Sequence, residues 1–195
     1  MITNNKIDYK AVLSEIKVDS YEETSNYLYE ILPDYWCWIY KKQVGTTGEI
    51  LQFKQNGFEY LFDLTSTNQS VRHDDRVIAA FGFSKLPENK RDTHRIHGFL
   101  QGVMTGKNAG DKGHFIAHAS GGGLDVNLFP QRQDINRGLS QRGKVWRSME
   151  RYCSKHPGTF FFTRPTYTDH SWRPSELEMG ILLSPNDLWV ESFEN

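Results

Sequence analysis

The chain has 195 residues, of which 37% are hydrophobic and 13% aromatic, a composition typical of a globular protein and not of a disordered one. Its 23 Lys and Arg and 24 Asp and Glu give a formal net charge of −1, so any affinity for a polyanion must come from how the charges are distributed. No apolar run approaches the roughly 20 residues of a membrane span, and no charged start leads into an apolar stretch, so we expect neither a transmembrane helix nor a secretory signal.

The first predicted elements are helical. Residues 7–30 place apolar and charged side chains at near-helical spacing and predict one or two helices. Ser20 followed by Glu23 is typical of a helix start with a capping box, and Pro33 is expected to end that helix. The aromatic run at residues 35–40 favours a strand, because aromatic side chains fit the pleated surface of a sheet. Core packing is its favoured role, and a platform for stacking on bases is the alternative.

The middle of the chain reads as strands and loops. Asn56-Gly57 stands between alternating apolar runs, a strong hairpin signal that predicts strands at residues 50–53 and 58–64. A turn is expected at 45–48, loops at 65–75 and 84–93, a strand at 76–83, and a strand or short helix at 95–102.

The second half mixes both kinds of element. We expect a short strand at 115–117, a glycine loop at 121–123, a strand at 124–129 and a turn at 130–134. A helix should run from 135 to 153 with an interruption near Gly143, followed by strands at 159–163 and 177–183 and a strand or short helix at 188–193. Without repeats or linkers, this order predicts a single α+β domain over residues 1–195 with a mixed or antiparallel sheet.

The distribution of charge and the spacing of the cysteines limit the kinds of binding site that the chain can carry. The first 34 residues are acid-rich, whereas residues 131–155 carry most of their charge as Lys and Arg. Such a basic segment is typical either of a phosphate-binding surface or of a solvated helix face. Cys37 and Cys153 lie far apart and in no metal-ligand spacing, which favours buried free thiols over a disulfide or a zinc site.

Four spaced elements lie between residues 110 and 150. They are Asp-Lys-Gly-His at 111–114, Asn-Leu-Phe-Pro-Gln at 127–131, an asparagine at 136 and a glutamate at 150. The pattern resembles the DNA/RNA non-specific endonucleases, the His-Me finger (ββα-metal) nucleases with a D-R-G-H signature, with Lys112 in place of the arginine. The resemblance covers roughly the second half of the chain. It implies a scaffold-rich half at 1–100 and a ββα-metal finger carrying the catalytic residues at 101–183.

The resemblance also implies roles for individual residues. His114 would be the base that activates water, a task suited to an imidazole near neutral pH. Asn136 would bind Mg²⁺ or Mn²⁺, and Glu150 would hold metal-bound water. An upstream arginine would contact the scissile phosphate, with Arg95 the first candidate and Arg91 the second. The gap between Asn136 and Glu150 is longer than the family's, as though residues 139–144 were inserted.

Other residues are expected to support these. Substrate contact is predicted for six residues, with an orienting role for the two amides among them: Lys112, Asn127, Gln131, Arg137, Arg147 and Arg151. Asp111 is expected to cap a turn or pair with a nearby basic group, and His118 to line the cleft. Each motif residue also has a structural interpretation: a satisfied histidine, a helix cap for Asn136, and a surface glutamate at 150.

The resemblance thus implies a metal-dependent, sequence-non-specific endonuclease acting on DNA, with RNA as a further candidate substrate, of the kind used as a bacterial toxin or defence effector. Expected partners are nucleic acid, an inhibitor or immunity protein and a second copy of the chain, with no membrane. The expected location is cytoplasmic, or outside after delivery by a specialised secretion system. The alternatives are an inactive nucleic-acid-binding or protein-interaction module on the same fold, and a phosphodiesterase for small nucleotides.

Overall fold

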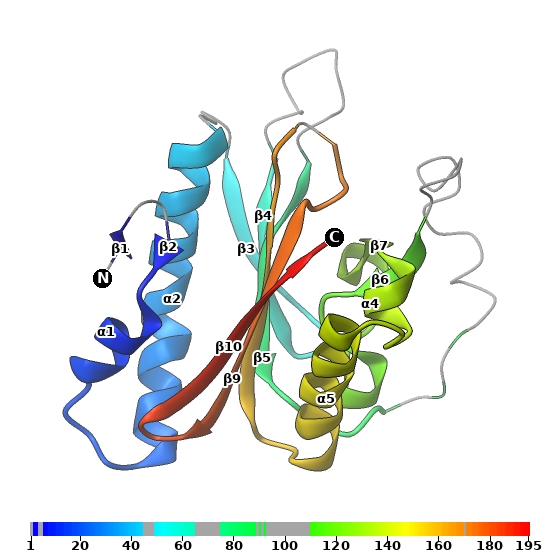
Figure 1. Cartoon of the computed structure of the whole chain (residues 1–195). Helices are drawn as coiled ribbons and strands as arrows, with labels where there is room; N and C mark the ends of the chain where they lie inside the picture. Colours follow the sequence, from blue (N-terminus) through cyan, green and yellow to red (C-terminus); the bar gives the residue numbers. More distant parts are fainter. Residues whose placement is uncertain are drawn as a thin grey trace.

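An antiparallel sheet of six strands forms the centre of the molecule (Figure 1). In this computed structural model, residues 2–3, 6–44, 49–64, 75–88, 90, 92, 110–169 and 171–195 are described. The strand order is β10-β9-β8-β5-β4-β3, and each neighbouring pair is antiparallel. The strands are β3 (Ile50–Gln55), β4 (Phe58–Asp63), β5 (Arg76–Phe83), β8 (Phe160–Thr166), β9 (Glu176–Ser184) and β10 (Asp187–Glu194). The predicted α+β class is confirmed, and its sheet is antiparallel.

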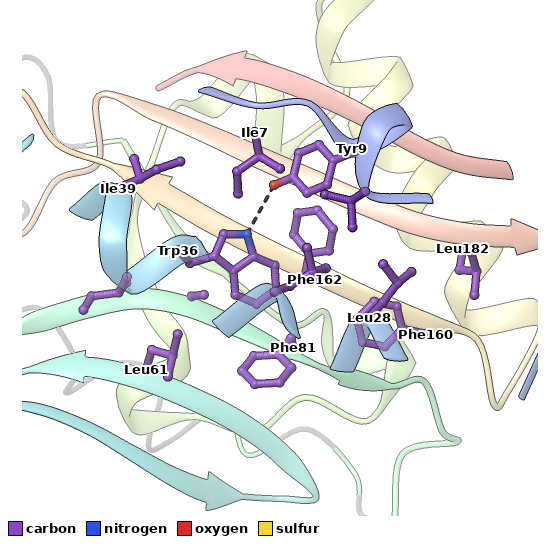
Figure 2. Close-up of a cluster of buried hydrophobic side chains, with 14 of the residues drawn as sticks. Ile7, Tyr9, Leu28, Trp36, Ile39, Leu61, Phe81, Phe160, Phe162 and Leu182 are labelled. Carbon is purple, nitrogen blue, oxygen red and sulfur yellow. Dashed lines mark hydrogen bonds between the residues drawn. The ribbon is translucent and has the colours of Figure 1, made fainter. Parts of the chain in front are cut away.

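The N-terminal elements lie against one face of this sheet (Figure 1). They are the short strands β1 (Ile2–Thr3) and β2 (Lys6–Ile7) and the helices α1 (Tyr9–Ser14) and α2 (Tyr21–Val44). Figure 2 shows the core between them, where Trp36 of α2 lies against Phe81 and Phe162 of the sheet. The indole nitrogen of Trp36 donates a hydrogen bond of 3.2 Å to the hydroxyl of Tyr9, so the one polar atom of that ring is satisfied where it is buried.

The observed helix α2 differs from two of the expectations for this segment. Its start is confirmed, because the Ser20 hydroxyl accepts a hydrogen bond of 3.2 Å from the Glu23 amide. Pro33, however, lies inside the helix and does not end it, and residues 35–40 are helical and not a strand. Leu28, Leu32 and Trp36 recur every four residues and are fully buried, so burial of this face outweighs both the missing proline donor and the strand preference of aromatic residues. The predicted core role of the aromatic run is confirmed at Trp36 and Tyr40.

The second face is covered by the segment that contains the motif. It consists of a two-stranded antiparallel sheet, β6 (Asp111–His114) with β7 (Leu128–Gln131), the 3-10 turns η2 (His118–Ser120) and η3 (Asp125–Asn127), and the helices α4 (Gln133–Asn136) and α5 (Gln141–Lys155). Trp146, Met149 and Cys153 lie on the buried side of α5 and pack into a second core with Phe161 and Phe193. The motif is therefore held against a rigid sheet.

Several predicted boundaries shift in this segment. The motif Asp-Lys-Gly-His is itself the strand, which ends at His114 instead of continuing through residues 115–117. The strand expected at 124–129 starts only at Leu128, after the turn η3, and includes Pro130 and Gln131, which were expected in a turn. The helix expected at 135–153 is divided at residues 137–140, not near Gly143.

Other local predictions are confirmed. Asn56 and Gly57 both have positive φ, as a tight hairpin turn requires, and join β3 to β4. The predicted strands at 76–83, 159–163, 177–183 and 188–193 correspond to β5, β8, β9 and β10. Cys37 and Cys153 are both free thiols, and Cys153 is buried as expected whereas Cys37 is only half-buried. Within the described ranges, no helix is both long and apolar enough to cross a membrane. The elements predicted at 45–48 and 95–102, and nearly all of the loop at 65–75, lie outside the described residues.

Candidate active site

A cleft of about 460 Å³ lies where β6, α4 and α5 meet. It is lined by ten residues from these elements and from the segment after β6: His114, Ala117, His118, Ala119, Asn136, Arg137, Arg147, Glu150, Arg151 and Ser154. The sequence singled out His114, Asn136 and Glu150 as a group, and the fold brings all three to this cleft from three different elements. Arg137, Arg147 and Arg151 line it as well, so three of the predicted substrate-binding cations lie beside them.

His114 is the last residue of β6 and pairs with Leu128 of β7. Its side chain is only 8% exposed, so the ring belongs to the wall of the cleft and does not project into solvent. Gly113 beside it is required by packing, because a Cβ there would lie 2.6 Å from the Cβ of Gln131. The Gly-His pair of the motif therefore has a steric reason in addition to any chemical one.

Asn136 is held by an acidic side chain from β6. Its carboxamide nitrogen donates a hydrogen bond of 3.0 Å to Oδ2 of Asp111. The same carboxylate accepts two hydrogen bonds of 2.6 Å from the guanidinium of Arg137, and this pairing holds the pKa of Asp111 below its usual value. The expectation that Asp111 pairs with a basic group is confirmed. With its nitrogen engaged, the carboxamide oxygen of Asn136 is its remaining polar atom.

Glu150 lies on α5, one helical turn after Arg147. The two side chains form an ion pair of 2.8 Å, in which the Glu150 side chain is 14% exposed and the Arg147 side chain 53% exposed. Helix α5 starts after Ser140, whose hydroxyl accepts a hydrogen bond of 3.0 Å from the Gly143 amide. Residues 139–144 therefore form the end of the break between α4 and α5 and the first turn of α5.

The structure corrects the substrate contact that was predicted for the two amide side chains of the 127–131 motif. Asn127 and Gln131 are both fully buried, so neither presents a surface to a substrate. Asn127 instead bonds at 2.8 Å to the amide and the carbonyl of Ile116 and to the carbonyl of Gly123. These side-chain bonds take the place of strand pairing at Ile116, after the Phe115 amide has donated a backbone bond of 3.0 Å to the carbonyl of Asn127. The orienting role expected for Asn127 agrees with this arrangement, whereas direct substrate contact does not.

One further candidate does not line the cleft, and two others lie outside the described residues. Lys112 is half-buried in β6 and is not part of the cleft lining. Arg95 and Arg91 lie outside the described residues, so their predicted contact with phosphate stays a prediction. His118 does line the cleft, but from the turn η2 and not from the strand that was expected to carry it.

The joint between β7 and α4 is fixed by a residue far along the chain. Asn195 accepts a hydrogen bond of 2.8 Å from the Arg132 amide and donates one of 2.8 Å to the carbonyl of Pro130. A third bond, of 2.9 Å, goes to the carbonyl of Pro174. No spacing pattern in the sequence links residue 195 to the motif, and sequence reasoning missed it.

The cleft contains oxygen donors suited to a hard cation. The carboxamide of Asn136 and the carboxylate of Glu150 are ligand types that Mg²⁺ and Mn²⁺ prefer, and a Mg²⁺ site needs few protein ligands because the ion keeps several waters. Among the residues that the structure describes, no group of three or more His, Cys, Asp or Glu side chains is placed to hold a metal ion. Any metal ion in this cleft would be held by a small set of ligands that includes an amide oxygen.

Comparison with known proteins adds no identification. No protein-family model matches the chain, and no curated protein matches it significantly.

Proposed function

We propose that the chain is a metal-dependent, sequence-non-specific endonuclease that hydrolyses phosphodiester bonds in DNA and in RNA. One observation supports this most directly. His114, Asn136 and Glu150, which the resemblance groups, line one cleft together with Arg137, Arg147 and Arg151. A base, two oxygen ligands and several cations are what hydrolysis of a phosphate ester requires. On this proposal, β6, β7 and the helices after them are the ββα-metal finger.

In the proposed reaction, His114 takes a proton from the attacking water. Its place at the end of a paired strand, in the wall of the cleft, fixes the ring relative to the substrate phosphate. The water oxygen forms a bond to phosphorus while the bond to the leaving oxygen breaks. A side chain that is held by packing loses little freedom in reaching this arrangement, which is the advantage of carrying the base on a strand.

Asn136 and Glu150 would hold the divalent cation, which supplies positive charge beside the phosphate and the leaving oxygen when it is bound. Asp111 prepares Asn136 for this role, because the hydrogen bond to the carboxamide nitrogen directs the oxygen away from β6. Release of Glu150 from Arg147 would free the carboxylate for the hydrated ion and the guanidinium for a phosphate oxygen.

Arg147 and Arg151 lie on the exposed side of α5, where a nucleic-acid backbone can approach. Contacts of this kind recognise phosphates and not bases, which supports activity without sequence preference. As a toxin or defence effector, such an enzyme would need an inhibitor or immunity protein in the cell that makes it. The same proposal includes a single domain over residues 1–195 that forms a homodimer. The enzyme would stay in the cytoplasm or be delivered by a specialised secretion system.

A plasmid-nicking assay tests the proposal. Supercoiled DNA should be nicked and then linearised with Mg²⁺ or Mn²⁺ and should stay intact with EDTA. His114→Ala should lower the rate at least a hundredfold, since general bases contribute typically 10²–10⁴-fold. His156→Ala is the matched control, because His156 is exposed at the end of α5 and outside the cleft lining. Equal nicking by both variants would remove His114 from the mechanism.

A second candidate is a module that binds nucleic acid without cleaving it. The ion pair between Arg147 and Glu150 favours it, because this pair engages a proposed metal ligand. Binding of DNA by a protein that cleaves neither DNA nor RNA under any divalent metal would establish that candidate. Cleavage of dinucleotides as fast as of long strands would instead indicate a phosphodiesterase for small nucleotides.

A further inference from the structure

A second pocket, of about 540 Å³, lies between the central sheet and the β6–β7 pair. Its walls are mostly apolar and include several aromatic rings, among them Phe53, Phe62, Phe115, Tyr167 and Trp172. Two of these rings are open to solvent, since Trp172 is 44% exposed and Phe53 is 36% exposed. Apolar and aromatic side chains grouped around a pocket and open to solvent are typical of a ligand-binding groove.

Trp172 stands on a loop that the sheet holds in place. Arg76 is buried in β5, and its guanidinium donates hydrogen bonds to the carbonyls of Asp169, at 2.6 Å, and Ser171, at 3.2 Å. The same guanidinium lies 4.1 Å from the ring centre of Tyr167. The loop therefore carries Trp172 on anchored backbone, which preorganises the ring for a partner.

The aromatic pocket is a neighbour of the candidate reaction cleft. His114 lines the cleft and the next residue, Phe115, lines the aromatic pocket, so the two spaces lie on either side of the end of β6. A third, polar pocket of about 410 Å³ borders both, because it shares His118 with the cleft and Asp125 with the aromatic pocket. Asp125 has a φ of 60°, a strained backbone of the kind found near functional sites.

We propose that the aromatic pocket is a base-stacking subsite, so that the preferred substrate is single-stranded nucleic acid lying across the end of β6. This rests on the proposed function and specifies its substrate. Phosphates occupy the arginine-lined cleft, and an unstacked base beside the scissile bond lies against Trp172 and Phe53. Proteins that bind single strands combine cationic grooves with aromatic faces in this way.

A duplex fits this arrangement poorly. Its bases are paired and stacked on each other, and placing one against Trp172 would require flipping it out of the helix at a cost. The run at residues 35–40 does not offer a competing platform, because Trp36 and Tyr40 are buried against the sheet. Trp38 is exposed, but it lies on α2 across the sheet from the cleft.

Binding without catalysis tests the subsite. The probe is a fluorescein-labelled oligothymidylate of about twelve nucleotides, followed by anisotropy in EDTA, beside a duplex of the same length. Trp172→Leu keeps apolar bulk and removes the ring, and should raise the Kd for the single strand roughly fivefold to a hundredfold, the range of stacking on one aromatic side chain. Trp172→Phe should restore most of the affinity. Trp38→Leu is the matched control, with the same residue type and a similar exposure of 47%, and should change nothing.

The outcomes separate this inference from the proposed function. Equal Kd values for Trp172→Leu and the wild type would overturn the subsite even if the enzyme cleaves DNA. Loss of single-strand binding in Trp172→Leu, with no cleavage by any variant, would keep the subsite and overturn the nuclease. Loss of duplex and single-strand binding alike, not restored by Trp172→Phe, would show a structural role for Trp172 and would also overturn the subsite.

Discussion

Asp111 and Arg137 face each other so that both carboxylate oxygens lie 2.6 Å from guanidinium nitrogens. Asp111 begins β6, the strand that ends in His114. Arg137 directly follows α4, the helix that ends in Asn136. Because Asp111 also accepts a hydrogen bond of 3.0 Å from the carboxamide of Asn136, the pair fixes the proposed metal ligand relative to the strand that carries the proposed base.

This pair should make stability depend on acid pH. The lowered pKa of Asp111, caused first by its hydrogen bonds to Arg137, means that the charged carboxylate stabilises the folded state. That contribution is fully present above the unfolded pKa of about 4 and is lost as the pH falls through the lowered value. Asp111→Asn should therefore be less stable than the wild type by about 0.5–1 kcal/mol at pH 7, with the difference shrinking below pH 4.

Urea unfolding at several pH values measures this difference. Asp187→Asn is the control, since Asp187 is exposed at the start of β10, away from the cleft. A difference between Asp111→Asn and the wild type that stays constant down to pH 2 would show that the charge of Asp111 is not what stabilises the fold.

The arginines of α5 should differ in their effect on salt dependence. Each phosphate contact that is lost should lower the slope of log K against log salt concentration by about 0.7–0.9. Arg151→Ala should show this reduction for DNA binding in EDTA, because Arg151 lines the cleft. Arg142→Ala should not, since Arg142 lies on the same helix but bonds to Glu191 and to the carbonyl of Ser192. Identical slopes for the two variants would place the DNA elsewhere.

Asn127 should act on stability and not on substrate affinity. Asn127→Ala leaves buried partners at Ile116 and Gly123 without hydrogen bonds and should cost about 2–4 kcal/mol. The KM of the protein that remains folded should be unchanged, because the side chain has no exposed surface. Asn186→Ala, at an exposed turn between β9 and β10, provides the control for the same substitution. A raised KM with unaltered unfolding would restore the substrate-contact interpretation of Asn127.

Gly143 should be intolerant of alanine although it lies in a helix. Alanine normally stabilises an exposed helix position relative to glycine by about 1 kcal/mol. Here the new Cβ would lie 2.1 Å from the carbonyl oxygen of Asp134, where α4 packs on α5, and we expect a loss of about 1–3 kcal/mol. Because the clash displaces α4, cleavage should fall with it. Gly158→Ala meets no atom within 4 Å and should lower stability through its φ of 90° while leaving the rate unchanged.

Local patterns in the sequence predicted local structure well. The Asn56-Gly57 turn and the strands around it follow from side chains near in sequence, and so does the cap at Ser20. Pro33 failed as a stop signal because the apolar face of α2 continues through it, and packing against the sheet decides the length of that helix. A local rule cannot include that burial, since the other half of the contact comes from strands distant in sequence.

At the candidate site, too, some features could be predicted from the sequence and others depend on the fold. The resemblance grouped His114, Asn136 and Glu150, and in the structure a strand, a short helix and a longer helix bring these three residues to one cleft. Spacing did not indicate that Asn127 and Gln131 are buried, because an amide can equally bind backbone or substrate. The rings of the aromatic pocket come from β3, β4 and the loop before β9, and only the folded sheet brings them beside residue 115.

The bonds of Asn195 impose an order of assembly. Its side chain joins the start of α4 to the loop before β9, and it follows β10 in the chain. During synthesis, the joint that sets Asn136 beside Asp111 cannot acquire these bonds until β10 has emerged and paired with β9. The proposed hydrolytic centre would thus mature only after the sheet behind it is complete.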